Sequence, residues 1–284
     1  MDTTNLEGRS ALVTGAGSGI GKETALLLAR RGAQLFLCDV NEQGLAETEG
    51  AARKLGREVV ARRVDVSKRE EMRAFAEAVH GRVEAVDLLV NNAGVGIGGG
   101  FLDTSLEDWD WIVGINLMGV VHGCHFFVPP MVKRGRGGHI VNLSSAAGYL
   151  ATAALAAYCT TKFGVLGLSE ALREELRPHG IGVTAICPGI VNTNITRTSP
   201  LRGAADTPET RERMVQMYQR RNYGPERVAM NLLRAVQRNR AVAPITPEAW
   251  GMYVLKRLSP SLTSWVSRRL GQRLEPPAAP GPAH

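Results

Sequence analysis

The chain has 284 residues, of which 44% are hydrophobic and 21% charged, as in a globular protein with a sizeable core. Its net charge is +7, but the basic residues are dispersed, without an aromatic-interleaved basic stripe or a zinc-finger pattern, which argues against nucleic acid as a partner. The sequence contains no run of about 18 apolar residues and no secretory leader pattern, so we expect a cytoplasmic protein that does not span a membrane. The scattered cysteines, Cys38, Cys124, Cys159 and Cys187, lack metal-ligand spacing and predict reduced core thiols, with no metal site.

Short apolar runs alternate with helix-like stretches along the chain. The runs predict strands over 11–14, 34–38, 59–64, 88–90, 139–143 and 182–186. Helix-like patterns cover 20–31, a polar stretch ending at 55, a stretch after 67, and 105–133 and 156–177. This alternation predicts an α/β fold of the doubly wound Rossmann type, with a parallel sheet covered by helices on both faces. No linker interrupts residues 6–248, which we expect to form one domain.

The C-terminal region differs in composition from the rest of the chain. Residues 249–274 predict an amphipathic basic helical extension, and the proline-rich residues 275–284 predict a disordered tail. Apolar residues recur at near-helical spacing within 250–270, with basic residues between them. We expect this helix to pack on the domain or on a neighbouring subunit. The alternative is a basic amphipathic surface that contacts a membrane.

A glycine-rich turn follows the first predicted strand and opens the first helix, over residues 14–21. Glycines allow the backbone to approach a pyrophosphate closely, and a helix N-terminus offers free N–H groups. A tight turn without a ligand is the alternative, but the position between strand and helix favours nucleotide binding. Asp39 ends the second strand 39 − 15 = 24 residues after Gly15, where a carboxylate can bind both ribose hydroxyls and repel a 2′-phosphate. The alternative is that Asp39 only caps the next turn.

Tyr158 and Lys162 stand four residues apart in a predicted helix, so both side chains lie on one face. A lysine ammonium beside a phenol favours the phenolate, so we expect the pKa of Tyr158 to be lowered. Taken alone, an exposed lysine beside a packed tyrosine would explain the pattern equally well.

Several motifs together resemble the short-chain dehydrogenase/reductase family over about residues 9–243. They are the TGxxxGxG pattern at 14–21, NNAG at 91–94, the Tyr-x-x-x-Lys pair and the Pro-Gly pair at 188–189. The resemblance implies a catalytic tetrad of Asn116, Ser145, Tyr158 and Lys162, with Ser145 placed by the family spacing of 158 − 13 = 145 and Ser144 as its structural neighbour. It also implies cofactor contacts from Gly15, Ser18, Gly19, Ile20, Gly21, Asp39, Asp65, Val66, Asn91, Ala93, Gly94, Tyr158, Lys162, Pro188, Gly189, Ile190 and Thr193. Within the NNAG motif we expect Asn91 to face the cofactor and Asn92 to be structural.

The function that the resemblance implies is hydride transfer between a nicotinamide cofactor and an alcohol or ketone, with Tyr158 as acid and base. Asp39 favours NAD over NADP. Small and apolar residues at 94–100 and 146–157, with a variable lid implied at 194–223, suggest a hydrophobic secondary alcohol or ketone. An NADP-dependent carbonyl reductase and a non-catalytic nucleotide-binding scaffold or redox sensor are the alternatives. Family members commonly assemble through their long helices, so we expect a homotetramer or a dimer.

Overall fold

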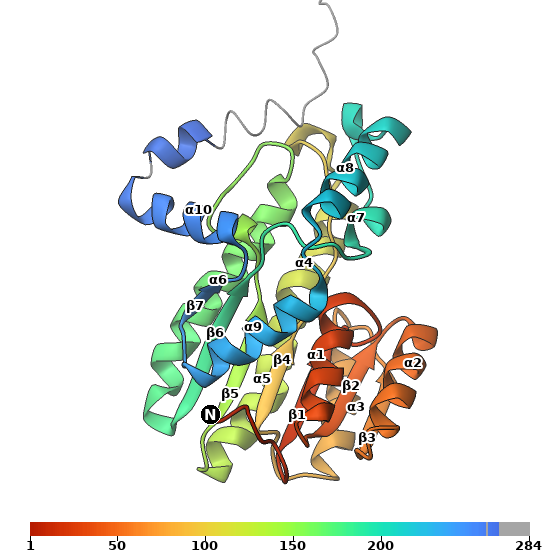
Figure 1. The fold of residues 1–284 in the computed structure, drawn as a ribbon, viewed down its shortest axis with the longest axis vertical. Helices are drawn as coiled ribbons and strands as arrows, with labels where there is room; N and C mark the ends of the chain where they lie inside the picture. Colours follow the sequence, from red (N-terminus) through yellow and green to blue (C-terminus); the bar gives the residue numbers. More distant parts are fainter. Residues whose placement is uncertain (260, 267–284) are drawn as a thin grey trace, which may run out of the picture.

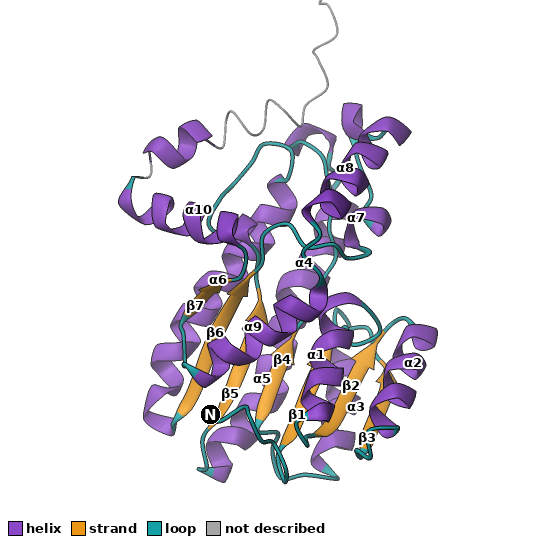
Figure 2. Cartoon of the chain, viewed as in Figure 1, coloured by secondary structure: helices purple, strands orange, loops and turns teal. Residues whose placement is uncertain are grey.

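A computed structural model describes residues 1–259 and 261–266, apart from the side chain of Thr196. Seven parallel strands form one sheet in the order β3-β2-β1-β4-β5-β6-β7, with helices on both faces (Figure 1). All strand arrows in Figure 2 therefore point toward one end of the molecule. This is the doubly wound Rossmann-type architecture that the sequence predicts. The edge where the strands end, called here the carboxyl edge, is where such sheets bind ligands.

The observed elements follow the predicted order closely. The strands are β1 (Ser10–Thr14), β2 (Gln34–Asp39), β3 (Val59–Arg63), β4 (Leu88–Asn91), β5 (Gly138–Leu143), β6 (Ile181–Cys187) and β7 (Val242–Pro244). The α-helices are α1 (Gly19–Arg30), α2 (Glu42–Arg53), α3 (Arg69–His80), α4 (Leu106–Val113), α5 (Gly119–Arg134), α6 (Ala156–Leu176), α7 (Ile195–Thr198), α8 (Pro208–Arg221), α9 (Pro225–Gln237) and α10 (Pro247–Leu258). Short 3₁₀ turns are η1 (Phe101–Asp103), η3 (Ala146–Gly148), η4 (Arg177–His179) and η5 (Gly203–Ala205), and η2 (Gly114–Met118) is a π-helical turn.

Both faces of the sheet are buried at its central strands, because successive strand residues enter two different cores. In β1, Ala11 and Val13 join the core beneath α1, α2 and α9, whereas Leu12 joins the core beneath α3, α5 and α6. In β2, Phe36 joins the second core with Leu12. A strand covered on both sides has no polar face, which is why these strands appear in the sequence as unbroken apolar runs.

The predicted helix over 105–133 is a continuous helical stretch, 106–134, whose middle turn is the π-helical η2. By length and hydropathy this stretch could cross a membrane, but half of its most apolar window is buried inside the domain. It packs against α3 and α6 as a core helix of the fold.

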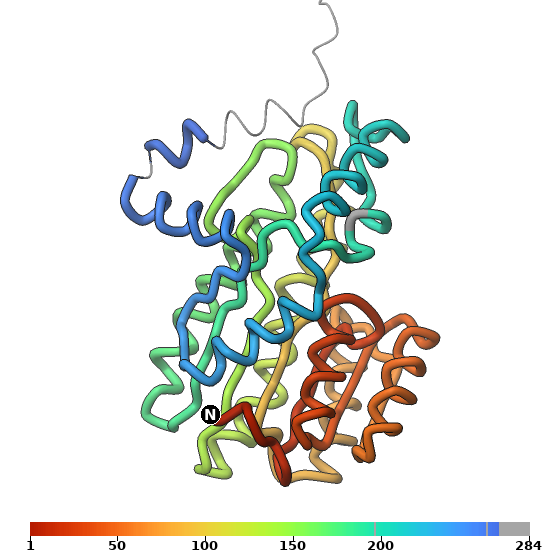
Figure 3. Tube along the Cα trace, in the orientation of Figure 1, coloured from red at the N-terminus to blue at the C-terminus, as the bar shows by residue number. Residues whose placement is uncertain are grey.

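Two segments rise above the carboxyl edge of the sheet, as the tube in Figure 3 shows. One is the predicted lid, 194–223, which contains α7 and α8. The other is α10, which packs on the η3 turn, where the Tyr149 hydroxyl donates a hydrogen bond to the Ala249 carbonyl at 2.7 Å. The expected extension over 249–274 is thus helical through Leu258 and again over 261–266. The rest of that extension and the expected disordered tail lie outside the described residues.

Candidate active site

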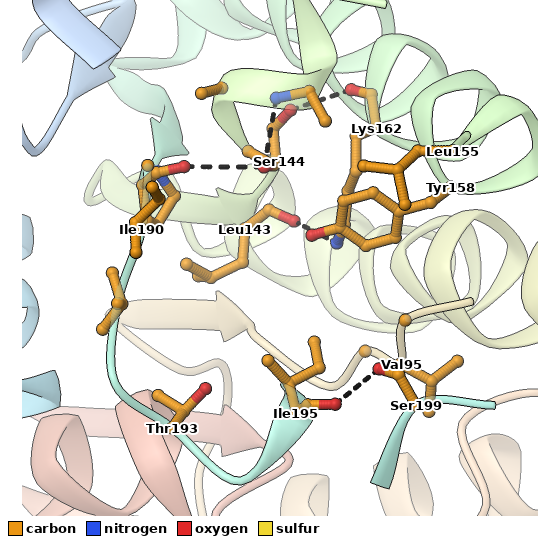
Figure 4. A pocket seen from close by; sticks show the side chains of 18 of the residues that line it. Val95, Leu143, Ser144, Leu155, Tyr158, Lys162, Ile190, Thr193, Ile195 and Ser199 are labelled. Atoms are coloured by element: carbon orange, nitrogen blue, oxygen red, sulfur yellow. Dashed lines mark hydrogen bonds between the residues drawn. The ribbon is translucent and has the colours of Figure 1, made fainter. Parts of the chain in front are cut away.

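A cavity of about 440 Å³ opens at the carboxyl edge between the lid, α6 and α10. Tyr158 and Lys162 line it on one side, and Thr193 and Ile195 line it opposite them (Figure 4). Ser145 is also a lining residue. The predicted catalytic residues therefore come from η2, the end of β5 and α6, and three of the four line one cavity.

Tyr158 and Lys162 lie one turn apart on α6, with the Lys162 Nζ 5.7 Å from the centre of the Tyr158 ring. The Lys162 ammonium is buried and donates a hydrogen bond to the Leu143 carbonyl at 2.9 Å. Ser144 contacts the backbone of the lysine, since its hydroxyl donates a hydrogen bond to the Lys162 carbonyl at 2.8 Å. Ser144 thus has the structural position that the sequence analysis gave it.

Burial governs the protonation of both side chains. Desolvation raises the pKa of Tyr158 to about 12, although a hydrogen bond with Ser145 acts in the opposite direction. Desolvation also lowers the pKa of Lys162 to about 8. The expectation that Lys162 would lower the pKa of Tyr158 is therefore wrong for the protein by itself, because loss of hydration outweighs every favourable contact of the phenol. The Tyr158 hydroxyl is therefore protonated at neutral pH.

Ser145 stands where β5 passes into η3, with an extended backbone. Its hydroxyl accepts a hydrogen bond from Ala147 N at 3.1 Å and lies 3.5 Å from the Pro188 carbonyl, to which it donates. These two contacts hold the hydroxyl in the cavity wall. A substrate oxygen beside Tyr158 would also be within the reach of Ser145.

Asn116 occupies the π-helical turn between α4 and α5, a distortion that is frequent at functional sites. It is fully buried, and its amide exchanges two hydrogen bonds with the backbone of Val95, at 2.8 and 2.9 Å. Both the Asn116 Oδ1 and the Lys162 Nζ lie next to Gly94, at 3.2 and 3.4 Å from where a Cβ on that glycine would be. The structure therefore brings Asn116 beside Lys162, and its predicted role in binding a water remains a prediction.

The glycine-rich turn forms a cradle between β1 and α1. Gly15 and Gly19 have left-handed φ angles of 65° and 52°, which favour glycine. A Cβ on Gly21 would lie 1.9 Å from the Gly15 carbonyl oxygen, so only glycine allows this turn to fold back on the helix. Ser18 is the N-cap of α1, and its hydroxyl makes no capping hydrogen bond. The cradle presents bare backbone at a helix N-terminus and is suited to a pyrophosphate.

Asp39 faces this cradle from the end of β2. Its Oδ2 accepts a hydrogen bond from Gly17 N at 2.7 Å and its Oδ1 accepts one from Asn41 N at 2.8 Å. The carboxylate thus braces the turn, as the capping alternative proposed, and each oxygen retains acceptor capacity for a ribose hydroxyl. Arg63 pairs in register with Asp39 on β3, but Glu71 binds its guanidinium at 3.0 Å.

The NNAG prediction is wrong in one respect, since the two asparagines have the opposite orientations. The Asn91 side chain is buried among the sheet residues and donates to Asn142 Oδ1 at 2.9 Å. Asn92 lines the cavity and donates to the carbonyls of Thr14 and Gly15 at 2.9 and 3.0 Å. Strand alternation explains the error, because the last residue of a doubly covered strand points into a core.

The two residues expected at the adenine are not in this cavity. Asp65 accepts hydrogen bonds from the backbone and hydroxyl of Ser67, at 3.0 and 2.7 Å. Val66 is buried, and its side chain packs against Gly119. Ala93 is held by the Thr14 hydroxyl, which accepts from Ala93 N at 3.0 Å. Nothing in these contacts tests an adenine-binding role.

The remaining predicted residues do line the cavity; they are Ile20, Gly94, Pro188, Gly189, Ile190 and Thr193. Sequence reasoning missed Glu248, whose Oε1 accepts from Ile190 N at 3.2 Å while its Oε2 pairs with Arg221 at 2.7 Å. It also missed Met214 and Tyr218 on α8 and Met252 on α10, which close the cavity from above. No motif marks these positions, because their role arises from the packing of the lid and α10.

Comparison with known proteins shows to which family the chain belongs. The family model for short chain dehydrogenases matches residues 9–202. Over 260 residues, 90% of this chain, the sequence is 42% identical to the probable oxidoreductase EphD of Mycobacterium tuberculosis, but it spans only 44% of the length of that protein. The putative oxidoreductase SadH of M. tuberculosis is 35% identical over 90% of this chain and 92% of its own. A short chain dehydrogenase/reductase from Burkholderia phymatum, crystallised in complex with NAD, superposes with a TM-score of 0.81 at 34% identity and covers 99% of both chains. The chain belongs to the short-chain dehydrogenase/reductase family.

Proposed function

We propose that the protein is an NAD-dependent oxidoreductase that interconverts a hydrophobic secondary alcohol and its ketone. The observation that carries this proposal is the cavity itself, in which a protonated Tyr158, Ser145 and the buried Lys162 stand at one end of an apolar chamber. When bound, the nicotinamide donates or accepts a hydride at its C4 atom.

The residues of the chain supply the proton and the orientation. In reduction, the Tyr158 hydroxyl donates its proton to the carbonyl oxygen of the substrate, and in oxidation the phenolate takes it back from the alcohol. Ser145 donates a hydrogen bond to the same oxygen and stabilises the charge that develops on it. Lys162 keeps a positive charge beside the phenol, which offsets the charge of the phenolate that remains after proton transfer. Asn116 positions the loop at Val95 and borders the lysine.

The chamber suits an apolar substrate. Apart from Lys162 and Glu248, no charged side chain of the described residues lines it, and Glu248 is already paired with Arg221. A carboxylate substrate would find no arginine there to bind it. The apolar lining comes from Val95, Ile97, Leu150, Leu155, Ile195, Leu201, Met214, Tyr218 and Met252.

The residues at the cradle fit a dinucleotide, and Asp39 favours NAD. The glycine turn offers close backbone approach for the pyrophosphate, and the Asp39 carboxylate would repel a 2′-phosphate. The Burkholderia relative with NAD bound supports the same choice. An NADP-dependent carbonyl reductase is the competing proposal, and titration of the protein with NADH and NADPH separates the two. Tighter NADPH binding would reject the role given to Asp39.

The acid–base role is tested by Tyr158→Phe, with Tyr218→Phe as the matched control in the same cavity. Tyr158→Phe should lose most turnover and still bind NADH, since only the transferable proton is removed. Tyr218→Phe should remain active, because we assign no proton transfer to its hydroxyl. Full activity of Tyr158→Phe would refute the mechanism, and equal losses in both variants would point to cavity shape instead of proton transfer.

We also propose that the protein is a homo-oligomer. Trp111 on α4 and Phe163 on α6 are more than one-third exposed, which is consistent with a face that another subunit covers. Sedimentation velocity tests this directly, and a purely monomeric species at micromolar concentration would refute it.

A further inference from the structure

A second, smaller cavity of about 210 Å³ is lined by the C-terminal half of α9, strand β7 and the start of α10. Figure 1 shows where these three elements lie in the fold. Asn231, Arg234 and Arg238 line it from one face of the α9 end, at helical spacings of three and four residues. Arg240 and Trp250 complete the wall. None of these residues lines the active-site cavity.

Three arginines therefore meet at one cavity. Among the described residues, no acidic side chain lines it and none forms an ion pair with any of the three arginines. Several other arginines are paired, as Arg202 is with Asp108 at 2.7 Å. The C-terminal dipole of α9 offsets only about half a charge, which leaves an excess of roughly +2.5 at this cavity.

Two of these arginines, Arg240 and Arg234, have side-chain contacts with other residues of the protein. The Arg240 guanidinium stacks on the Trp250 ring, 5.5 Å from its centre. Arg234 Nη1 donates to Asn231 Oδ1 at 3.3 Å, and the Asn231 amide donates to the Tyr223 hydroxyl at 2.9 Å.

The turn that carries Arg238 and Arg240 is also braced. Asn239 adopts a left-handed φ of 47°, and Arg173 donates to its side chain and its carbonyl at 2.9 and 2.8 Å. Thr184 donates to the Arg240 carbonyl. Like-charged groups held together in this way are expected to attract an anion with several acceptor oxygens.

We propose that this cavity is a binding site for a phosphate group, either free phosphate or a phosphomonoester. At neutral pH such a group carries about −1.5 to −2 charges and offers three or more acceptor oxygens, which complements the excess charge and the guanidinium donors. The site is separate from the dinucleotide cradle. It shares α10 with the active site, since Trp250 lies between Glu248 and Met252 on that helix.

Calorimetric titration with inorganic phosphate and with glycerol 3-phosphate, in a zwitterionic buffer at constant ionic strength set with sodium chloride, tests the proposal. Arg238→Gln and Arg240→Gln should each weaken binding about tenfold or more, because each removes charge-assisted hydrogen bonds. Arg69→Gln is the matched control, an equal loss of charge at an exposed arginine of α3 on the opposite face of the sheet. It should bind as the unmodified protein does. Circular dichroism verifies that each variant is folded.

The outcomes separate the sources of the ligand. Tighter binding of glycerol 3-phosphate identifies a phosphomonoester, whereas equal binding of both probes identifies the phosphate group alone; both support the site. Binding that persists in Arg238→Gln and Arg240→Gln would place the anion elsewhere and overturn the proposal. The same holds if these variants change only the sedimentation coefficient, since the arginines would then serve contact between copies of the chain.

Discussion

Replacement of Lys162 by methionine should make the protein more stable at neutral pH while it removes the proposed activity. The folded state lowers the pKa of this lysine from 10.5 to about 8, because burial penalises the ammonium. A shift of this size means that the buried ammonium destabilises the folded protein by about 3 kcal/mol at pH 7, where the lysine is charged in both the folded and the unfolded state. The lost hydrogen bond to the Leu143 carbonyl offsets about 1 kcal/mol or somewhat more. We therefore expect Lys162→Met to gain about 1–2 kcal/mol at pH 7.

The pH dependence provides the sharper test. Above pH 8 the folded protein releases the Lys162 proton while the unfolded chain retains it to 10.5, so this group makes stability rise with pH between those values. About 1 kcal/mol of the difference between the two proteins should disappear between pH 7 and pH 9. Urea unfolding followed by circular dichroism measures it, with Lys133→Met, at an exposed site on α5, as the control. A difference between Lys162→Met and the unmodified protein that is the same at pH 7 and pH 9 would refute the reasoning.

Three further changes probe the frame around the site. Gly21→Ala should destabilise the protein by about 1–3 kcal/mol or more and weaken NADH binding, because its Cβ would lie 1.9 Å from the Gly15 carbonyl oxygen. Urea unfolding measures the first effect and NADH fluorescence the second. A variant that equals the parent in both would contradict the role given to the glycine turn. Arg202→Gln should raise KM more than it lowers kcat, because the two hydrogen bonds of Arg202 to Asp108, at 2.7 and 2.8 Å, fasten the lid to α4; unchanged KM would show that the lid is held by other contacts. The full chain should co-sediment with anionic liposomes if α10 contacts membranes, and a truncation at Pro247 should not; equal sedimentation of both would exclude α10 as the cause.

The liposome experiment matters because only one side of α10 packs on the domain, as we expected for the C-terminal helix. Ala249 is buried and Tyr253 stacks edge-on against Tyr149, as for a helix packed on the domain. On the other side Trp250, Val254 and Leu258 are 41%, 45% and 79% exposed, an apolar stripe at the spacing of successive turns. Packing on a neighbouring subunit would also cover this stripe, so sedimentation velocity on the truncated chain completes the comparison.

The parts of the site that the sequence predicted are those fixed by local chemistry. The positions of Tyr158 and Lys162 follow from helix periodicity, and the cradle follows from backbone conformations that only glycine adopts readily. Strand positions were also readable, because a doubly covered parallel strand must be apolar throughout.

What the sequence could not supply depends on long-range packing. Nothing around Glu248 in the sequence indicates that it accepts from Ile190 N, 58 residues away. The direction of the pKa shift of Tyr158 was also out of reach, because the degree of burial outweighs the neighbouring charge and burial is a property of the whole fold. The prediction for Asn91 was wrong for a related reason, since its side chain binds Asn142 on the neighbouring strand β5, a contact between residues far apart in the sequence.

The strand order has a consequence for synthesis on the ribosome. Strand β2 joins one side of β1 and β3 extends that side, while β4, β5, β6 and β7 join the other side in the order in which they are made. No strand has to enter between two that are already paired, so each can dock on an open border as it emerges. A nascent chain can therefore enlarge its sheet stepwise from the N-terminus, and the unpaired border that invites aggregation is covered by the next strand to leave the exit tunnel. The helix α9, which completes the first core, emerges only after six of the seven strands are in place.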